Sequence, residues 1–101
     1  MMKVTVLYSH PTSPEEFEKY YTDTHLPLAA KLQGVDRLEL TKFVDGPDGD
    51  KPAFYRMAEL YFATQEQMDD ILGSPKGQAV VDDIPKFATG GITMMVGTTE
   101  G

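Results

Sequence analysis

The 101-residue chain contains no cysteine, no tryptophan and only two histidines. Without cysteine it can form no disulfide, no thiolate nucleophile and no zinc–thiolate site. Two histidines do not make a plausible metal cluster, and no apolar run reaches the roughly 18 residues of a membrane-spanning helix. These absences predict a cytoplasmic protein with no metal site and no membrane association.

Basic residues are also scarce. Nine Lys and Arg stand against 16 Asp and Glu, for a formal net charge of -7, and the basic residues are scattered singly. A nucleic-acid-binding protein would carry a basic stripe to neutralise phosphates, so we expect no nucleic-acid partner. The hydrophobic content of 41% is that of an ordinary globular protein, and the length predicts a single domain over residues 1–101.

Hydrophobic periodicity and turn residues predict the order strand, helix, strand, strand, helix, strand. The predicted strands span 3–9, 35–44, 53–62 and 91–97, and 45–52 is a loop. Ser13 with Glu16, and Thr64 with Gln67, form capping boxes that begin the two main helices. A Ser-Pro pair at 74–75 begins a further short helix that ends near Pro85. This order predicts an α+β, ferredoxin-like βαββαβ two-layer sandwich with an antiparallel sheet.

The predicted strands carry apolar side chains on both faces of the sheet. In the first strand, for example, Val6 and Tyr8 lie on one face and Leu7 on the other. Helices can cover only one face, and a bare second face would expose more apolar surface than monomers usually tolerate. We therefore predict a homodimer in which two sheets pack together.

His25 lies two residues before Pro27 in the first predicted helix. Pro27 leaves the Asp23 carbonyl without a helical partner, and Leu26 should avoid helical dihedrals, so the helix should bend or break. His25 could then be aimed differently from its neighbours, with Tyr21 on the same side of the helix. One interpretation is a catalytic or ligand-contacting imidazole at a cavity mouth; the other is a structural histidine that caps the freed carbonyls or packs as a polar edge residue.

Four other residues are candidates for contacts with a substrate. Tyr8, Tyr21 and Leu28 lie on predicted apolar faces, where tyrosine hydroxyls could orient a polar ligand. Glu59 interrupts an apolar strand, so its carboxylate must be paired or neutral. It is either a site residue or one partner of a cross-strand or cross-subunit ion pair.

The segments "YYTDTHLPLAAKL", "AELYF" and "GQAVVDDIPKFATGG" together resemble the EthD family of small dimeric α/β-barrel proteins, over nearly the whole chain. The resemblance implies one EthD-like domain whose sheet pairs with that of a second copy to form a dimeric α/β barrel. It also implies catabolism of small organic compounds alongside oxidoreductase systems, and the histidine of the family's H-L-P-L motif matches His25.

Two functions are consistent with these patterns. The first is an enzyme, without a cofactor and of oxidoreductase, isomerase or cyclase type, in which His25 is a general acid or base acting on a small apolar oxygen-bearing compound. The second is a non-catalytic ligand-binding or accessory module for a partner oxidoreductase. Haem chemistry through His25 is a third hypothesis, suggested by haem-handling relatives.

Overall fold

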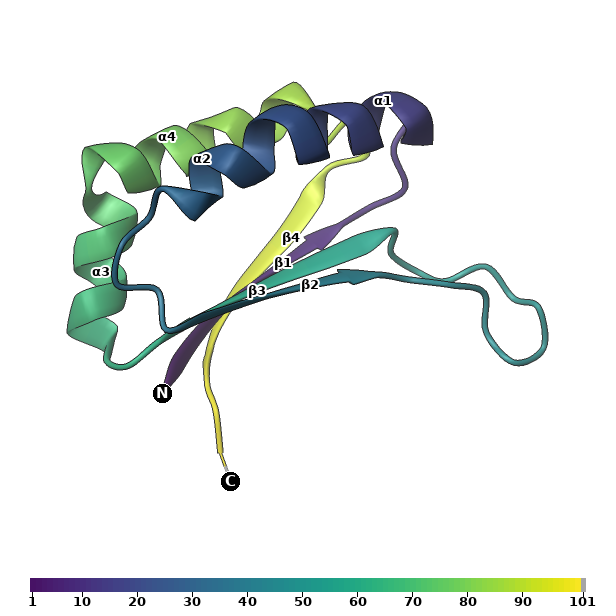
Figure 1. Ribbon diagram of the computed structural model, residues 1–101. Helices are drawn as coiled ribbons and strands as arrows, with labels where there is room; N and C mark the ends of the chain where they lie inside the picture. The colour runs from purple at the N-terminus through teal and green to yellow at the C-terminus, as the bar shows by residue number, and fades with distance from the viewer. Residues whose placement is uncertain (101) are drawn as a thin grey trace.

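A four-stranded antiparallel sheet forms one layer of the protein, and α1, α2 and α4 lie over one of its faces in the computed structural model, which describes residues 1–100 (Figure 1). The strands, in the spatial order β2-β3-β1-β4, are β1 (Met2–Tyr8), β2 (Arg37–Lys42), β3 (Arg56–Phe62) and β4 (Ile92–Thr98). All three neighbouring pairs are antiparallel. The predicted α+β, ferredoxin-like βαββαβ sandwich is confirmed.

The helical segments begin where the capping residues predicted. They are α1 (Pro14–Tyr20), the π-helical turn η1 (Tyr21–His25), α2 (Leu26–Ala30), α3 (Gln65–Gly73), α4 (Pro75–Asp83) and the 3-10 turn η2 (Ile84–Lys86). The hydroxyls of Ser13, Thr64 and Ser74 each accept a hydrogen bond from a backbone N–H three residues on. Each cap satisfies a donor that the first helical turn would otherwise leave unpaired.

Pro27 does not break the helical layer, and the predicted departure of Leu26 from helical dihedrals is wrong. Leu26 has φ -61° and ψ -39°, and its N–H donates to the Tyr21 carbonyl five residues earlier. Pro27 lies in the first turn of α2, where a helix leaves backbone N–H groups without partners in any case, so its missing donor costs little. The disturbance takes the form of one wide π-turn instead of a break.

The core lies between the sheet and the helices. Val4 and Val6 of β1 are paired with Leu60 and Ala58 of β3, and these residues face the helical layer. The largest fully buried side chains are aromatic: Tyr8, Phe17, Tyr21 and Phe62. Each such side chain contributes about 1.5–3 kcal/mol through burial, so the aromatic cluster holds the helices to the sheet.

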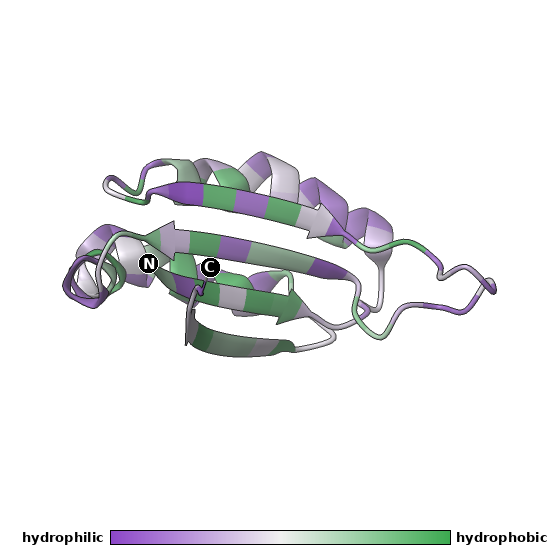
Figure 2. Cartoon of the chain, turned by 90° about the horizontal axis from the view of Figure 1, so that it is seen from below, coloured by the Kyte–Doolittle hydropathy of each residue, from purple (hydrophilic) through white to green (hydrophobic). Residues whose placement is uncertain are grey.

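The other face of the sheet has no helix over it among residues 1–100. Viewed from this side, hydrophilic and hydrophobic residues alternate along the strands, and hydrophobic residues predominate in β4 (Figure 2). Met95 on this face is 49% exposed. The chain itself therefore leaves this face bare, as predicted from helices that can cover only one face of the sheet.

Across residues 1–100, every helix is too short or too polar to span a lipid bilayer.

Candidate functional site

A cavity of ≈ 60 Å³ lies between the helix-facing side of the sheet and the helical layer. Its walls come from all four strands and from η1, α2, α3 and α4, and they are almost entirely apolar. The lining residues are Val4, Val6, Tyr8, Tyr21, His25, Leu26, Ala29, Leu32, Leu38, Leu40, Ala58, Leu60, Leu72, Val80, Val81, Ile84 and Met94. His25 is the only member of this set with a side chain that can be cationic, so the cavity suits a neutral ligand.

His25, the last residue of the π-turn, is 5% exposed and forms a buried pair with Asp83 at the end of α4. Its Nδ1 lies 2.9 Å from Asp83 Oδ2. An ionised carboxylate can only accept a hydrogen bond, so Nδ1 carries the proton and donates it. The second ring nitrogen, Nε2, is then an acceptor that remains for a ligand of the cavity, which is the state a general base needs.

The side chain of Asp83 is buried, with 4% exposed, and each of its carboxylate oxygens accepts a hydrogen bond. The Tyr20 hydroxyl donates to Oδ1 at 2.6 Å, while His25 occupies Oδ2. Burial acts to raise the pKa of Asp83, but the hydrogen bonds from Tyr20 and His25 outweigh burial and leave this pKa below its ordinary value. Asp83 therefore stays ionised at neutral pH and can stabilise a protonated His25.

Aromatic rings surround the imidazole. The Tyr21 ring is nearly parallel to it at 5.9 Å, and the Phe87 ring lies 4.6 Å from it. Burial, only partly opposed by Arg56, raises the pKa of Tyr21 to about 12, and burial likewise raises that of Tyr8. Both phenols are protonated at neutral pH, and the Tyr21 hydroxyl is buried without a hydrogen-bond partner in residues 1–100. It could donate to an oxygen atom of a ligand.

The structure brings together three of the five predicted site residues. His25, Tyr8 and Tyr21 all line the cavity. Leu28 does not, and its predicted place there is wrong: with the wide π-turn at Tyr21–His25, His25 is buried, Thr24 is exposed, and Leu26 and Ala29 line the cavity instead. The position of Pro27 predicted a bend or a break in the helix, and the helix shows a π-turn just before Pro27 instead of a break.

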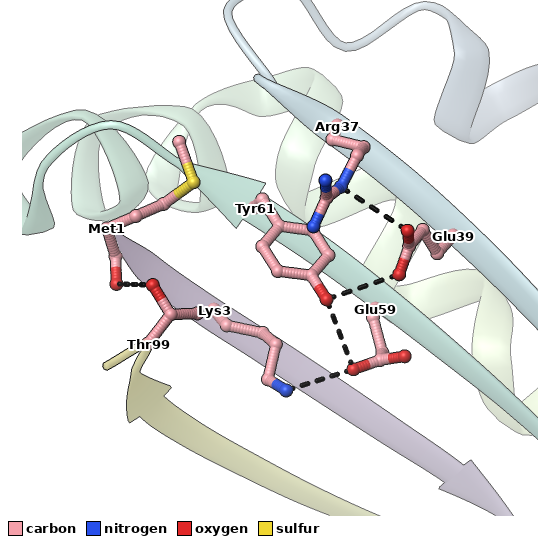
Figure 3. A network of polar contacts seen from close by, with 7 residues as sticks. All are labelled: Met1, Lys3, Arg37, Glu39, Glu59, Tyr61 and Thr99. Atoms are coloured by element: carbon pink, nitrogen blue, oxygen red, sulfur yellow. Dashed lines mark hydrogen bonds and ion pairs between the residues drawn. The ribbon is translucent and has the colours of Figure 1, made fainter. Parts of the chain in front are cut away.

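Glu59 lies on the opposite face of the sheet, so its predicted contact with a substrate in this cavity is also wrong. Lys3 on the neighbouring strand donates to it at 3.0 Å, which confirms the alternative of a cross-strand ion pair. Figure 3 shows this network, in which the Tyr61 hydroxyl lies 3.2 Å from Glu39 and 3.4 Å from Glu59. The alternation of strand residues placed Glu59 with Tyr61 and opposite the cavity.

Sequence reasoning missed Asp83 and Tyr20. Asp83 shares a helical face with the buried residues Val80, Ile84 and Phe87, and a carboxylate within an apolar stripe signals a paired group. Tyr20 is harder to find, because it lies five residues from His25 and an ordinary α-helix would place the two on different faces.

No group of three or more metal-ligating side chains occurs within residues 1–100. The geometry thus defines an α+β protein with a ferredoxin-like fold and a buried histidine–carboxylate pair at the wall of an apolar cavity.

Comparison with known proteins identifies the family. Residues 9–91 match the EthD domain, and the chain belongs to the EthD family. An uncharacterised 11.0 kDa protein from the thcB-thcC intergenic region of Rhodococcus erythropolis is 37% identical over 95 residues, which cover 94% of this chain and 91% of the relative.

Solved structures agree with this assignment. An ethyl tert-butyl ether D (EthD) family protein from Bacillus halodurans superposes with a TM-score of 0.91 at 32% identity and covers 99% of each chain. A Dabb family protein with a ferredoxin-like fold from Mesorhizobium loti has a TM-score of 0.72 at 19% identity, with 99% of this chain and 97% of that one covered. The second likeness shows the fold alone.

Proposed function

We propose that the protein is a small cytoplasmic enzyme of catabolism that acts on a small apolar oxygen-bearing compound in the cavity, with His25 as general acid and base. The observation that carries this proposal is the His25–Asp83 pair at the wall of an otherwise apolar cavity. Proton transfer of this kind is needed in isomerisation and cyclisation, and in cofactor-free oxidation with dioxygen as the oxidant.

The chemistry follows from the hydrogen bonds. His25 Nε2 accepts a proton from the bound compound, and the imidazolium that forms is stabilised by the ionised Asp83 on Nδ1. The surrounding aromatic rings keep the local dielectric low, which strengthens this attraction. Tyr8 or Tyr21 orients the oxygen of the compound, and His25 returns the proton when the product forms. General acid–base catalysis of this type contributes about 10²–10⁴-fold.

The size of the cavity and the name of a related protein both support the proposed class of substrate. At ≈ 60 Å³ it is far below the roughly 300–1,000 Å³ of clefts for drug-sized ligands and cofactors. A small compound therefore fits, whereas a haem does not, and we propose activity without a cofactor. The family name of the Bacillus halodurans protein refers to ethyl tert-butyl ether, a small apolar molecule with one oxygen.

The proposal is tested with purified protein and ethyl tert-butyl ether, together with small ketones and phenols, as probes. We expect a compound of this set to shift the NMR signals of His25 and Tyr21. The ether has no acidic proton and serves as a binding probe, whereas turnover is measured as the exchange of a ketone's α-hydrogens with solvent deuterium. His25→Ala should lower turnover by at least about 10²-fold, whereas Glu59→Gln, on the opposite face of the sheet, should leave it unchanged. Full turnover in His25→Ala, or ligand-induced shifts confined to the opposite face, would reject the proposal.

A second function is favoured by the almost wholly apolar lining of the cavity. The protein would bind a hydrophobic metabolite, or serve a partner oxidoreductase, without catalysis. In that case binding of the same probes survives in His25→Ala, and no product forms with the wild-type protein.

We also propose that the active form is a homodimer in which the bare faces of two sheets pack together into an α/β barrel. The support is the sheet face that the helices of one chain leave uncovered (Figure 2), on which Met95 is 49% exposed. Such a partner would enclose the network around Glu59.

A further inference from the structure

Two donors from one helical segment converge on a single buried carboxylate. Tyr20 reaches Asp83 Oδ1 at 2.6 Å and His25 reaches Oδ2 at 2.9 Å. The two donors are separated from Asp83 by 63 and 58 residues in the chain. The carboxylate is thus held at both oxygens and cannot rotate without losing a hydrogen bond.

The π-turn explains how both donors can reach the same group. In an α-helix, residues five apart are rotated by about 140° around the axis and point to different faces. A π-turn repeats from residue i to i+5, and η1 spans Tyr21–His25 directly after Tyr20. The turn therefore aligns the side chains of Tyr20 and His25, and π-turns of this kind are common at functional sites.

Phe87 supports both donor rings. The Tyr20 ring stacks on Phe87 at 5.5 Å with an interplanar angle of 21°, and the His25 ring lies 4.6 Å from the same side chain. Phe87 follows η2, which continues directly from the helix that carries Asp83. One short segment thus supplies both the carboxylate and the aromatic surface that orients its two partners.

We propose that Tyr20 is a positioning residue that holds Asp83 in the orientation that keeps the proton of His25 on Nδ1. This inference rests on the proposed function of His25, which it extends to a Tyr20–Asp83–His25 triad. Tyr20 does not line the cavity with His25; it borders a separate groove between α1 and the segment that follows α4. Its effect on the chemistry is therefore indirect, through the carboxylate.

The other groups near Asp83 determine how its carboxylate should respond when the Tyr20 hydroxyl is removed. Besides Tyr20 and His25, Lys86 lies 3.9 Å from Oδ1, but its side chain is largely exposed and its charge is screened by water. Without the Tyr20 hydroxyl, one oxygen of Asp83 is buried with no close donor. The carboxylate then becomes more basic and free to turn away from His25.

The test uses NMR of the full-length protein and needs no substrate. In Tyr20→Phe we expect the pKa of Asp83, followed by its carboxyl ¹³C shift, to rise. We also expect the minor Nε2–H tautomer of His25, followed by ¹⁵N shifts, to increase roughly tenfold, the equivalent of one hydrogen bond. Tyr61→Phe is the matched control, because its hydroxyl contacts carboxylates on the opposite face of the sheet, and it should change neither signal. If both His25 and Asp83 signals stay at wild-type values in folded Tyr20→Phe, the proposal is overturned.

A second measurement uses the wild-type protein and stays decisive if the variant does not fold. As pH is varied, the Tyr20 Cζ resonance should shift with the same midpoint as the carboxyl resonance of Asp83. A Tyr20 resonance that does not change over the titration of Asp83 overturns the proposal. Both measurements report on the triad alone. Unchanged His25 and Asp83 signals in Tyr20→Phe reject the role of Tyr20, whereas full turnover in His25→Ala rejects the proposed function.

Discussion

Among the individual residues, Asp83 links stability to pH. Its pKa in the folded protein is below the ordinary value of 3.8 because the hydrogen bonds from Tyr20 and His25 outweigh burial. A depressed folded-state pKa means that the unfolded chain binds this proton more readily. The stabilisation is complete above about pH 4 and is lost as pH falls through the folded-state pKa.

Asp83→Asn should remove this contribution. At pH 7 we expect the free energy of unfolding to fall by about 1–3 kcal/mol, the cost of leaving buried partners unsatisfied, as measured by urea denaturation. The difference from wild type should begin to shrink below about pH 4, where the unfolded chain takes up this proton, and should be smallest below the folded-state pKa, where Asp83 is protonated in both states. Asp82→Asn, at the exposed neighbouring position, should stay within about 0.5 kcal/mol of wild type at every pH. A difference that persisted at low pH would show that the shape of the side chain matters and its charge does not.

At the level of secondary-structure elements, the junction of α3 and α4 fixes where Asp83 lies. Gly77 in the first turn of α4 packs against the end of α3: a Cβ there would collide with the Ile71 carbonyl oxygen and lie 2.8 Å from Leu72 Cα. Both of these atoms belong to backbone, which cannot rotate away as a side-chain end could. The approach of the two helices, and with it the position of α4 beside the π-turn, depends on this glycine.

Gly77→Ala should therefore destabilise the protein by at least about 1–3 kcal/mol and shift the NMR signals of His25, because α4 must move. Gly73→Ala is the matched control: a Cβ at Gly73 has no atom within 4 Å, and the loss of glycine flexibility should stabilise the helix by about 0.4–1 kcal/mol. Urea denaturation of both variants measures the contrast. Equal stability of the two variants would mean that the junction relaxes without cost.

At the level of the whole molecule, the bare face of the sheet predicts self-association. Met95 lies on this face, in register with Thr5 of the neighbouring strand, and is 49% exposed in the single chain. A charge at this position costs the monomer little, but it would be buried unpaired between two packed sheets at a cost of several kcal/mol.

We expect the wild-type protein to sediment as a dimer and Met95→Glu to sediment as a folded monomer in analytical ultracentrifugation. Val44→Glu, at a side chain 80% exposed beyond the end of β2, is the control and should remain dimeric. A wild-type monomer at every concentration would contradict the dimer. A dimeric Met95→Glu would place the interface elsewhere, for example on the exposed apolar side chains of the edge strands.

Local sequence signals determined the elements and much of the fold. The Ser13, Thr64 and Ser74 caps begin their helices as predicted, because a capping hydroxyl and its partner N–H are only three residues apart. The alternation along the strands determined which residues share a face, and Tyr21 and His25 lie together because they are near neighbours on one helical segment.

Tertiary structure alone decided the partner of His25. Asp83 is 58 residues away, and nothing in the local pattern specifies how two distant helices pack or which nitrogen of an imidazole meets a carboxylate. The same holds for Glu59, whose strand pattern left open a ligand or an ion pair until the pairing of β1 with β3 brought Lys3 beside it. Short-range hydrogen bonds and periodicity are encoded residue by residue, whereas the site depends on helix packing and strand register, which only the whole chain determines.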